Sequence, residues 1–382
     1  MKLLREISRI AKQFIFFPIN FGNYLFGTFY HDNFLSKSKK IYSGHVSLNE
    51  RVVIYLIFPE KGITKSHLRS LKHLIKNNYS PLVVCNLPLS TQDQKEILNN
   101  CWTLIERKNY GYDFGGYREG ILFLNEKLKK IDNLILINDS TWFPISYENT
   151  FFDFIENNNL DFIGATSHYG FPRLQLPTKR EDLTKPLNFN SKNRRFHYAS
   201  FALSFSNKIL KDKSFFNFWK KLRLSGTKNI IVRRGEVGIT QYVLRNKNYS
   251  HGSLIDSGQL KNIFKNLSKE MLIKIAQESI IENTSLKKFK NKFLKNLEDF
   301  SKDEITAFIL ILVSRQIIVF SLIKFLIEEL NFPFLKKMLL KLDEESACST
   351  YEIIKKLDHE IFDEINSEIK ENRLLRGFIS VS

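Results

Sequence analysis

Cysteine is scarce in this sequence: three occur in 382 residues, and no two of them are spaced as a CxxC pair. Cys85 and Cys101 fall within apolar stretches, and Cys348 stands alone near the C-terminus. This usage argues against a disulfide framework and against a cysteine zinc site. We therefore expect reduced thiols in a cytoplasmic protein.

Long uncharged apolar runs are absent as well. The longest candidate, residues 305–323, is interrupted by Arg315, whereas a membrane-spanning helix needs about 20 consecutive, mostly apolar residues. Near the N-terminus, the charges of Arg9 and Lys12 break up the apolar region that a secretory signal requires. The expected location is the cytoplasm, with peripheral attachment to the inner face of the cell membrane left open.

Acidic residues are few relative to basic ones. Lysine and arginine total 58 against 40 aspartates and glutamates, which gives a formal net charge of +18. Such a surplus favours nucleic acids, anionic membranes or phosphorylated substrates as partners. The lysines are spread along the chain, however, and no nucleic-acid-binding module is recognisable, so nucleic acid is the least favoured of these partners.

The sequence is rich in apolar runs of strand length, which alternate with helical patterns between residues 51 and 262. Such runs are typical of strands buried on both faces of a parallel sheet. Strands are predicted over residues 52–58, 81–85, 102–105, 134–137, 162–166 and 198–205. Helices are predicted over residues 64–77, 91–100 with Ser90 as N-cap, 118–130, 214–222 and 237–244. The alternation predicts an α/β domain with a mostly parallel sheet, in which ligands bind at the carboxyl ends of the strands.

The flanking regions differ from this pattern. Residues 1–50 form a basic, aromatic lead that either packs on the main domain or contacts lipid head groups. Residues 263–382 lack predicted strands and are expected to form a helical C-terminal subdomain, with helices over 303–330, 335–342 and 351–371. The first of these helices is apolar nearly all round, which fits either the core of the subdomain or contact with a membrane.

Between the third predicted strand and the next helix lies a segment rich in glycine and aromatic residues, from Glu106 to Arg118. Glycines at such a turn let the backbone approach a ligand closely, and a helix N-terminus offers free N–H groups to a phosphate. Arg118 can pair with a diphosphate, and Asp113 can accept hydrogen bonds from a ribose or a nucleobase. The glycine spacing excludes a Walker loop and the GxGxxG fingerprint. An ordinary tight turn, with Asp113 as a helix cap, stays open.

A second polar cluster, Asn138-Asp139-Ser140, follows the fourth predicted strand. Its carboxylate is placed to hold a Mg²⁺ or Mn²⁺ ion that bridges a nucleotide diphosphate, and the alternative is an Asx-turn that closes the strand. Because the ends of neighbouring strands converge on one crevice, we expect this cluster and the glycine-rich segment to meet there.

Together the two motifs resemble the rhamnan synthesis protein F family. The residues that carry the resemblance are Asn109-x-Gly111-Tyr112-Asp113-Phe114-Gly115-Gly116-Tyr117-Arg118 and Leu136-Ile137-Asn138-Asp139-Ser140. Supporting stretches follow in the same order at residues 162–166, 197–201, 215–219, 236–238 and 332–336. The resemblance implies a GT-A-like nucleotide-sugar fold and a glycosyltransferase of rhamnose-containing cell-wall polysaccharides or lipopolysaccharide O-antigens.

The resemblance also implies that both motifs hold the donor nucleotide sugar, through Asn109, Gly111, Asp113, Gly115, Gly116, Arg118, Asn138, Asp139 and Ser140. The broader family-2 transferases have an Asp-x-Asp at the second motif, whereas this chain has one carboxylate there, Asp139. A metal bound by Asp139 and a metal-free site are therefore both open. Without a metal, the charge of the diphosphate would fall to Arg118 or to Arg233 and Arg234.

An inverting transfer also needs a general base beside the acceptor hydroxyl. Glu236 is the first candidate, because it follows two arginines and a glycine and opens a predicted helix; a glutamate favoured by the helix dipole is an equal alternative. Asp161 is a weaker candidate. His197 is a candidate contact to the acceptor or to a phosphate, and His251 a candidate metal ligand, although a lone histidine is more often structural.

We therefore expect a glycosyltransferase at the membrane periphery that moves a deoxyhexose, such as rhamnose from a dTDP-linked donor, onto a growing lipid-linked glycan. Two other classes of protein stay open. The single carboxylate of the second motif also fits a non-catalytic scaffold of a polysaccharide assembly complex. The net charge alone suggests a nucleic-acid-binding protein.

Overall fold

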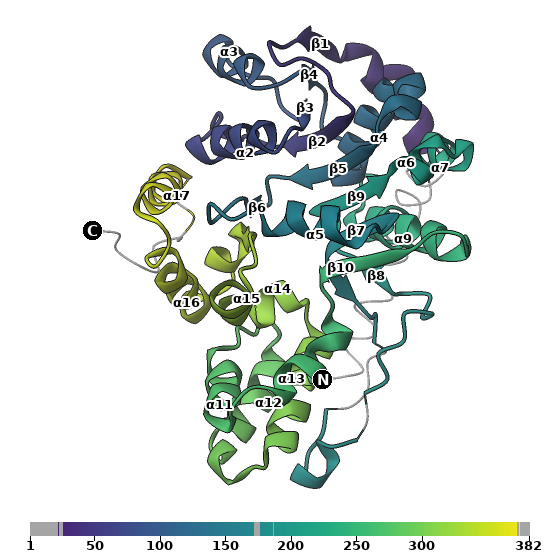
Figure 1. The fold of residues 1–382 in the computed structure, drawn as a ribbon. Helices are drawn as coiled ribbons and strands as arrows, with labels where there is room; N and C mark the ends of the chain where they lie inside the picture. The colour runs from purple at the N-terminus through teal and green to yellow at the C-terminus, as the bar shows by residue number, and fades with distance from the viewer. Residues whose placement is uncertain (1–21, 23–25, 172–175, 186, 373, 375–382) are drawn as a thin grey trace.

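The structure, a computed structural model, describes residues 22, 26–171, 176–185, 187–372 and 374. A sheet with helices packed on it makes up the upper part of the molecule in Figure 1, and helices of the C-terminal part of the chain lie below it. Residues 1–21 of the basic, aromatic lead lie outside the described part, so the expected lipid contact of that segment stays a prediction.

Within the described part of the chain, nine strands form the sheet, in the order β1-β4-β3-β2-β5-β9-β7-β10, with β8 paired to β7. Their bounds are β1 Lys40–Ser43, β2 Arg51–Ile57, β3 Ser80–Cys85, β4 Thr103–Glu106, β5 Asn133–Asn138, β7 Phe162–His168, β8 His197–Tyr198, β9 Ala202–Ser206 and β10 His251–Ile255. Strands β4, β3, β2 and β5 pair in parallel, as do β7 and β10, whereas β1 and β9 run antiparallel to their neighbours. The predicted α/β fold with a mostly parallel sheet is confirmed.

The helices between the strands are α2 Lys65–Lys76, α3 Thr91–Asn99, α4 Tyr112–Leu124, α5 Thr150–Asn158, α6 Asn207–Lys211, α7 Lys213–Lys221, α8 Lys228–Arg234 and α9 Glu236–Arg245. The predicted N-cap of α3 is confirmed, because the Ser90 hydroxyl accepts the N–H of Asp93 at 3.1 Å. Helix α4 starts at Tyr112 rather than at Arg118, since the left-handed conformation of Gly111, with φ of 81°, turns the chain directly into the helix.

Side chains alternate along β2 between two apolar layers of the core. Val53, Tyr55 and Ile57 belong to the layer that α2 and the C-terminal helices complete. Val52, Ile54 and Leu56 belong to the layer that α4, α7 and α9 complete. The central strands are therefore buried on both faces, as their continuous apolar runs predict.

The C-terminal helices are α10 Leu260–Lys265, α11 Lys269–Glu278, α12 Thr284–Leu294, α13 Lys302–Arg315, α14 Ile318–Ser321, α15 Ile323–Leu330, α16 Glu344–Ile354 and α17 His359–Asn372. The single helix predicted over residues 303–330 is wrong, because Gln316 is extended, with φ of −141° and ψ of 150°, and ends α13. Among the residues that the structure describes, no helix combines the length and apolar character needed to span a bilayer.

The helix predicted over residues 335–342 is only partly correct, because residues Lys337–Lys341 form a 3-10 helix whereas the two residues before it form a strand. Leu335–Lys336 form strand β11, which pairs antiparallel with β6, Thr141–Trp142. The ring of Phe334 anchors this segment by stacking on Phe143, with 4.5 Å between the ring centroids. A short strand thus ties the C-terminal region to the segment that follows β5.

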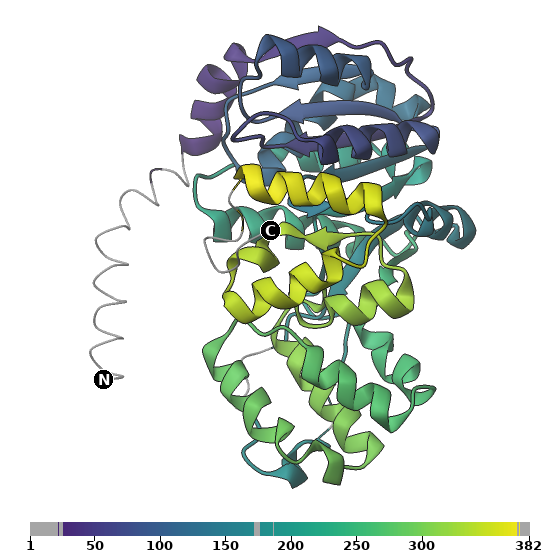
Figure 2. The same ribbon diagram turned by 90° about the vertical axis from the view of Figure 1, so that its left-hand side faces the viewer.

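In the region predicted as a helical C-terminal subdomain, the described residues, 263–372 and 374, share an apolar core with one face of the sheet. Helix α17 crosses back to α2 (Figure 2), where Arg69 pairs with Glu364 at 2.7 Å. Glu368 of α17 is buried among strand and helix residues and accepts a hydrogen bond from the indole N–H of Trp142 at 3.0 Å. The C-terminal helices therefore help to build the edge of the sheet at which β5 ends.

Candidate functional site

The structure brings the two sequence motifs together at the carboxyl end of β5. Asn138, the last residue of β5, donates from Nδ2 to Oδ2 of Asp113 in the first turn of α4, at 3.1 Å. Glu236, the first residue of α9, lies at the same edge and accepts the backbone N–H of Ser200 at 2.7 Å. Burial and the nearby carboxylates of Asp139 and Glu236 raise the pKa of Asp113. Asp113 therefore lies in the field of both neighbouring carboxylates.

The carboxylate of Asp139 is held in a fixed position. Its Oδ2 accepts the backbone N–H of Phe58 at 2.6 Å and a hydrogen bond from Nε2 of His67 at 3.2 Å. Because Nδ1 of His67 accepts the N–H of Thr64, at 3.0 Å, Nε2 must carry the proton of the neutral ring. Burial alone would raise the pKa of Asp139, but the hydrogen bonds from His67 and from the N–H of Phe58 outweigh it and lower the pKa below its usual value.

A lysine from the C-terminal region completes the site. In the β6–β11 ladder Lys336 lies opposite Thr141, and its Nζ donates to the hydroxyl of Ser140 at 2.9 Å. The same Nζ lies 4.2 Å from the centroid of the Phe201 ring. Burial lowers the pKa of Lys336, while the carboxylates of Asp113 and Glu236 act in the opposite direction.

We call these six residues the strand-end cluster: Asp113, Asn138, Asp139, Ser140, Glu236 and Lys336. The sequence motifs did not predict the role of Lys336, which ends a stretch that only supports the family resemblance. The residue that positions Asp139, His67, was missed as well. No spacing rule connects a histidine in α2 or a lysine in β11 to the motif at the end of β5, because the contacts depend on tertiary packing.

The side chains at Asn138-Asp139-Ser140 do not fit a metal site formed by the protein alone. Within the described residues, no group of three or more histidine, cysteine, aspartate or glutamate side chains is placed to hold a metal ion. One oxygen of Asp139 already accepts two hydrogen bonds, and the ammonium of Lys336 contacts Ser140. Divalent Mg²⁺ and Mn²⁺ prefer several oxygen ligands, and a neighbouring ammonium repels them.

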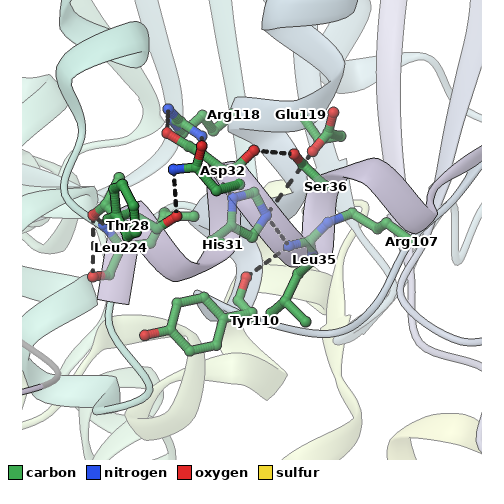
Figure 3. Close-up of polar contacts among 12 residues, drawn as sticks. Thr28, His31, Asp32, Leu35, Ser36, Arg107, Tyr110, Arg118, Glu119 and Leu224 are labelled. Atoms are coloured by element: carbon green, nitrogen blue, oxygen red, sulfur yellow. Dashed lines mark hydrogen bonds and ion pairs between the residues drawn. The ribbon is translucent and has the colours of Figure 1, made fainter. Parts of the chain in front are cut away.

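Arg118 faces away from the strand-end cluster. It follows Asp113 by five residues, which places it about 140° around the helix, and its guanidinium meets Asp32 at 2.7 and 2.9 Å. Figure 3 shows Arg118 beside Asp32, and the same guanidinium donates to the carbonyls of Trp219 and Lys220 at 3.0 and 3.1 Å. Its side chain is 5% exposed. Because these contacts use the guanidinium to join segments of the fold, we remove Arg118 from the expected donor site.

The glycines of the first motif have roles in packing. A Cβ atom on Gly115 would lie 1.9 Å from the carbonyl oxygen of Tyr110, and one on Gly116 would lie 2.3 Å from Cδ1 of Leu56. Glycine at these positions therefore lets α4 approach the turn and β2 closely. Gly111 supplies the left-handed residue that starts α4. The glycines are explained by the close packing of α4 on the turn and on β2. A close approach of the backbone to a ligand at this position stays a prediction.

The remaining candidates divide between the two edges of the sheet. His197 lies beside the strand-end cluster, with 3.9 Å between its Nε2 and Oε2 of Glu236. Asp161 immediately precedes β7, at the opposite edge, and accepts hydrogen bonds from the ammonium of Lys208 and the backbone N–H of Ser250. His251 opens β10 at that opposite edge and contacts the hydroxyl of Tyr198 at 2.6 Å. Asp161 and His251 are therefore not brought to the site.

The other basic and polar candidates lie on connecting segments. Asn109 is exposed in the connection between β4 and α4. Arg233 and Arg234 form the last turn of α8, and Arg234 donates to the carbonyl of Arg223 at 3.1 Å. Lys228, the first residue of α8, is exposed and adds positive charge near Asp113.

The fold and the strand-end cluster define a mixed α/β protein with a charged site at the carboxyl ends of its strands. The model of the family described as rhamnan synthesis protein F matches residues 82–365, so the chain belongs to this family. Protein y4gN of Sinorhizobium fredii is 28% identical over 246 residues, which cover 63% of this chain and 57% of that protein. Virulence protein VirA of Vibrio anguillarum is 35% identical over 107 residues, covering 27% and 34% of the two chains. The chain thus spans between about one third and three fifths of these relatives.

Two solved structures are distantly similar. Core-mannan synthase A from Aspergillus fumigatus, in its Mn/GDP form, matches with 12% identity and a TM-score of 0.26, over 47% of this chain and 65% of that chain. TarS 1–349 from S. aureus matches with 11% identity and a TM-score of 0.28, over 86% and 90% of the two chains. These TM-scores are too low to transfer a ligand or a mechanism to this chain.

Proposed function

We propose that the chain is a glycosyltransferase of cell-surface polysaccharide synthesis that binds a nucleotide-sugar donor at the strand-end cluster. The observation that carries this proposal is the contact between Asp113 and Asn138, because it joins the two motifs of the family at the carboxyl ends of the strands. In open α/β sheets this edge is where ligands bind. The donor in the proposal carries a deoxyhexose, such as rhamnose linked to dTDP, and the acceptor is a lipid-linked glycan at the inner face of the membrane.

The proposed reaction is an inverting transfer. The acceptor hydroxyl oxygen attacks C1 of the donor sugar, the bond from C1 to the diphosphate oxygen breaks, and the leaving nucleoside diphosphate keeps the electron pair. Glu236 takes the proton of the hydroxyl as general base. Its Oε1 is engaged with the N–H of Ser200, so Oε2, which faces His197, is the oxygen left to receive the proton.

The carboxylates of Asp113 and Asp139 have separate roles in the proposal. Asp139 is fixed by Phe58 and His67 and holds the ribose or orders the diphosphate through bound water. Asp113 lies at the N-terminus of α4, where it accepts hydrogen bonds from the ribose or the nucleobase. His197 contributes a contact to the acceptor.

A thermal-shift screen of nucleotide sugars, with and without Mn²⁺, tests the proposal. A donor that binds the folded chain raises its melting temperature by mass action, and the free sugar and the nucleoside serve as controls. The donor found in this way then enters a sugar-transfer assay with Asp139→Ala and Glu236→Ala. If no nucleotide sugar stabilises the protein, or if both variants keep full transfer activity, the proposed site is wrong.

A further inference from the structure

We propose that Lys336 is the cation that binds the diphosphate of the donor, so that the chain holds its donor without a divalent metal ion. The proposal rests on the proposed function and adds the residue that neutralises the charge of the donor. The strand-end cluster has one carboxylate at the second motif and an ammonium group in contact with the hydroxyl of that motif.

The β6–β11 ladder determines which way Lys336 points. Lys336 is the last residue of β11, and Lys337 opens the 3-10 helix Lys337–Lys341, so the chain changes direction between them and their side chains have different surroundings. The Nζ of Lys336 meets Ser140 at 2.9 Å, whereas the Nζ of Lys337 pairs with Glu368 at 2.6 Å on the side of α17. Backbone bonds hold this register, because Lys337 donates its N–H to the carbonyl of Ser140 at 3.1 Å. Two adjacent lysines thus have different environments, one at the site and one within the fold.

The ammonium of Lys336 keeps hydrogen-bonding capacity for a ligand. An ammonium carries three donors, and the contacts of Nζ among the described residues are the Ser140 hydroxyl and the face of the Phe201 ring. No ion pair within 4.0 Å joins it to a carboxylate of the described part of the chain, in contrast to Lys337. Lys336 therefore contributes a positive charge that forms no ion pair within the described residues. The nearby carboxylates of Asp113 and Glu236 act to raise its pKa.

This position suits the charge that develops during transfer. When the bond from C1 to the diphosphate oxygen breaks, the electron pair stays on the leaving group, and a nearby ammonium stabilises it. Lysine binds phosphate as a compact point charge without a fixed geometry. Lys228, exposed at the start of α8, adds a second positive charge near Asp113. These two lysines supply the positive charge that a metal ion would otherwise bring.

The test compares adjacent lysines by isothermal titration of the full chain with dTDP, UDP and GDP, each in EDTA and again in Mn²⁺. The wild type is expected to bind at least one of these nucleotides with equal affinity in both conditions. Lys336→Gln should weaken that binding roughly tenfold to a hundredfold, the usual effect of losing a charged hydrogen bond, and Lys336→Arg should retain part of it. Lys337→Gln is the matched control and should bind as the wild type does, with a lower melting temperature because the buried Glu368 loses its cationic partner.

Two results overturn the inference while leaving the proposed function standing: binding by the wild type that requires Mn²⁺, or binding by Lys336→Gln as tight as that of the wild type. Absence of nucleotide binding by the wild type in both conditions overturns the proposed function, and the inference with it. Melting curves of both glutamine variants show that a loss of binding by Lys336→Gln occurs in a folded protein.

Discussion

Helix α4 contributes to two charged clusters that differ in how completely their charges are matched. The strand-end cluster contains three carboxylates and one ammonium, at the edge where β5 ends. On another side of the helix lies the Arg118 cluster, which we define as His31, Asp32, Lys39, Arg107, Arg118 and Glu119 (Figure 3).

In the Arg118 cluster every charged group has a partner within the cluster or nearby. Arg118 pairs with Asp32 at 2.7 Å, and Lys39 pairs with Glu119 at 2.5 Å. Arg107 donates to the carbonyl of Tyr110 at 2.7 Å and to Nε2 of His31 at 3.3 Å. These bonds join the N-terminal residues to α4, so the cluster acts as a structural connection.

The glycine-rich motif contributes residues both to a structural cluster and to the proposed functional site. Where buried charges are matched within the protein, they hold segments together. In the strand-end cluster, burial and neighbouring carboxylates raise the pKa of Asp113, and burial lowers that of Lys336; displaced pKa values are typical of sites that bind a ligand or move a proton. The same short segment supplies Arg118 to the first kind of cluster and Asp113 to the second.

The largest expected effect is a loss of activity, and it should occur in the strand-end cluster and not in the Arg118 cluster. Glu236→Gln should lower kcat for sugar transfer by about 10²–10⁴-fold, since an amide cannot act as a general base. The melting temperature should change little, because the amide oxygen still accepts the N–H of Ser200. Steady-state assays and melting curves check both expectations, with Glu126→Gln on the surface as the control. Full activity of Glu236→Gln would exclude it as the base.

The next largest expected effect is on the free energy of unfolding. Arg118→Met should destabilise the protein by roughly 2–4 kcal/mol, because it removes the hydrogen bonds of the guanidinium to Asp32 and to two backbone carbonyls. Arg118→Lys should recover a part of this stability. Urea unfolding measures the loss. In the fraction that is folded, nucleotide affinity should match the wild type. A loss of nucleotide affinity with unchanged stability would instead return Arg118 to the donor site.

A smaller effect tests the packing role of the motif's glycines. Gly116→Ala should cost about 1–3 kcal/mol, the usual penalty for overpacking, because its Cβ would lie 2.3 Å from Cδ1 of Leu56. Gly238→Ala in α9 is the matched control, since its nearest neighbour lies at an ordinary 3.6 Å. That variant should gain about 0.5–1 kcal/mol of helix propensity. Equal unfolding midpoints of the two variants would contradict the packing role.

The sequence predicts the parts of the molecule that depend on local pattern. The apolar runs identify β2 to β5, and the expectation that the two motifs meet agrees with the contact of Asp113 and Asn138. Both follow from rules that act over one strand and its neighbour, burial on two faces and the common edge of parallel strands.

The parts that could not be predicted depend on residues far apart in the sequence. Lys336 reaches Ser140 through a two-residue strand, too short to produce a period, and Leu335 to Leu342 contains enough leucine and lysine to resemble a helix. Arg118 looked like a ligand contact because its partner, Asp32, lies in the N-terminal lead outside any motif. Long-range ion pairs of this kind have no sequence spacing by which to recognise them.

The smallest expected effect is the loss of stability at acidic pH. Burial would raise the pKa of Asp32, but hydrogen bonds from His31 and Arg118 outweigh it and lower the pKa from 3.8 to about 2. The unfolded chain therefore binds a proton at a pH where the folded chain does not, so the stabilisation by Asp32 is complete above pH 3.8 and is lost as the pH falls toward 2. The side chain is 40% exposed, and screening limits the contribution to less than about 1 kcal/mol.

Asp32→Asn tests this difference directly. At pH 6 the variant should unfold at lower urea than the wild type, because Arg118 loses a charged partner. Between pH 4 and pH 2.5, roughly the range in which the two states bind protons differently, the gap between the two midpoints should close. Comparing midpoints at each pH removes the acid sensitivity that both proteins share. A gap that stays constant over this range would mean that the charge of Asp32 contributes nothing to the Arg118 cluster, and that this cluster is held by its neutral hydrogen bonds.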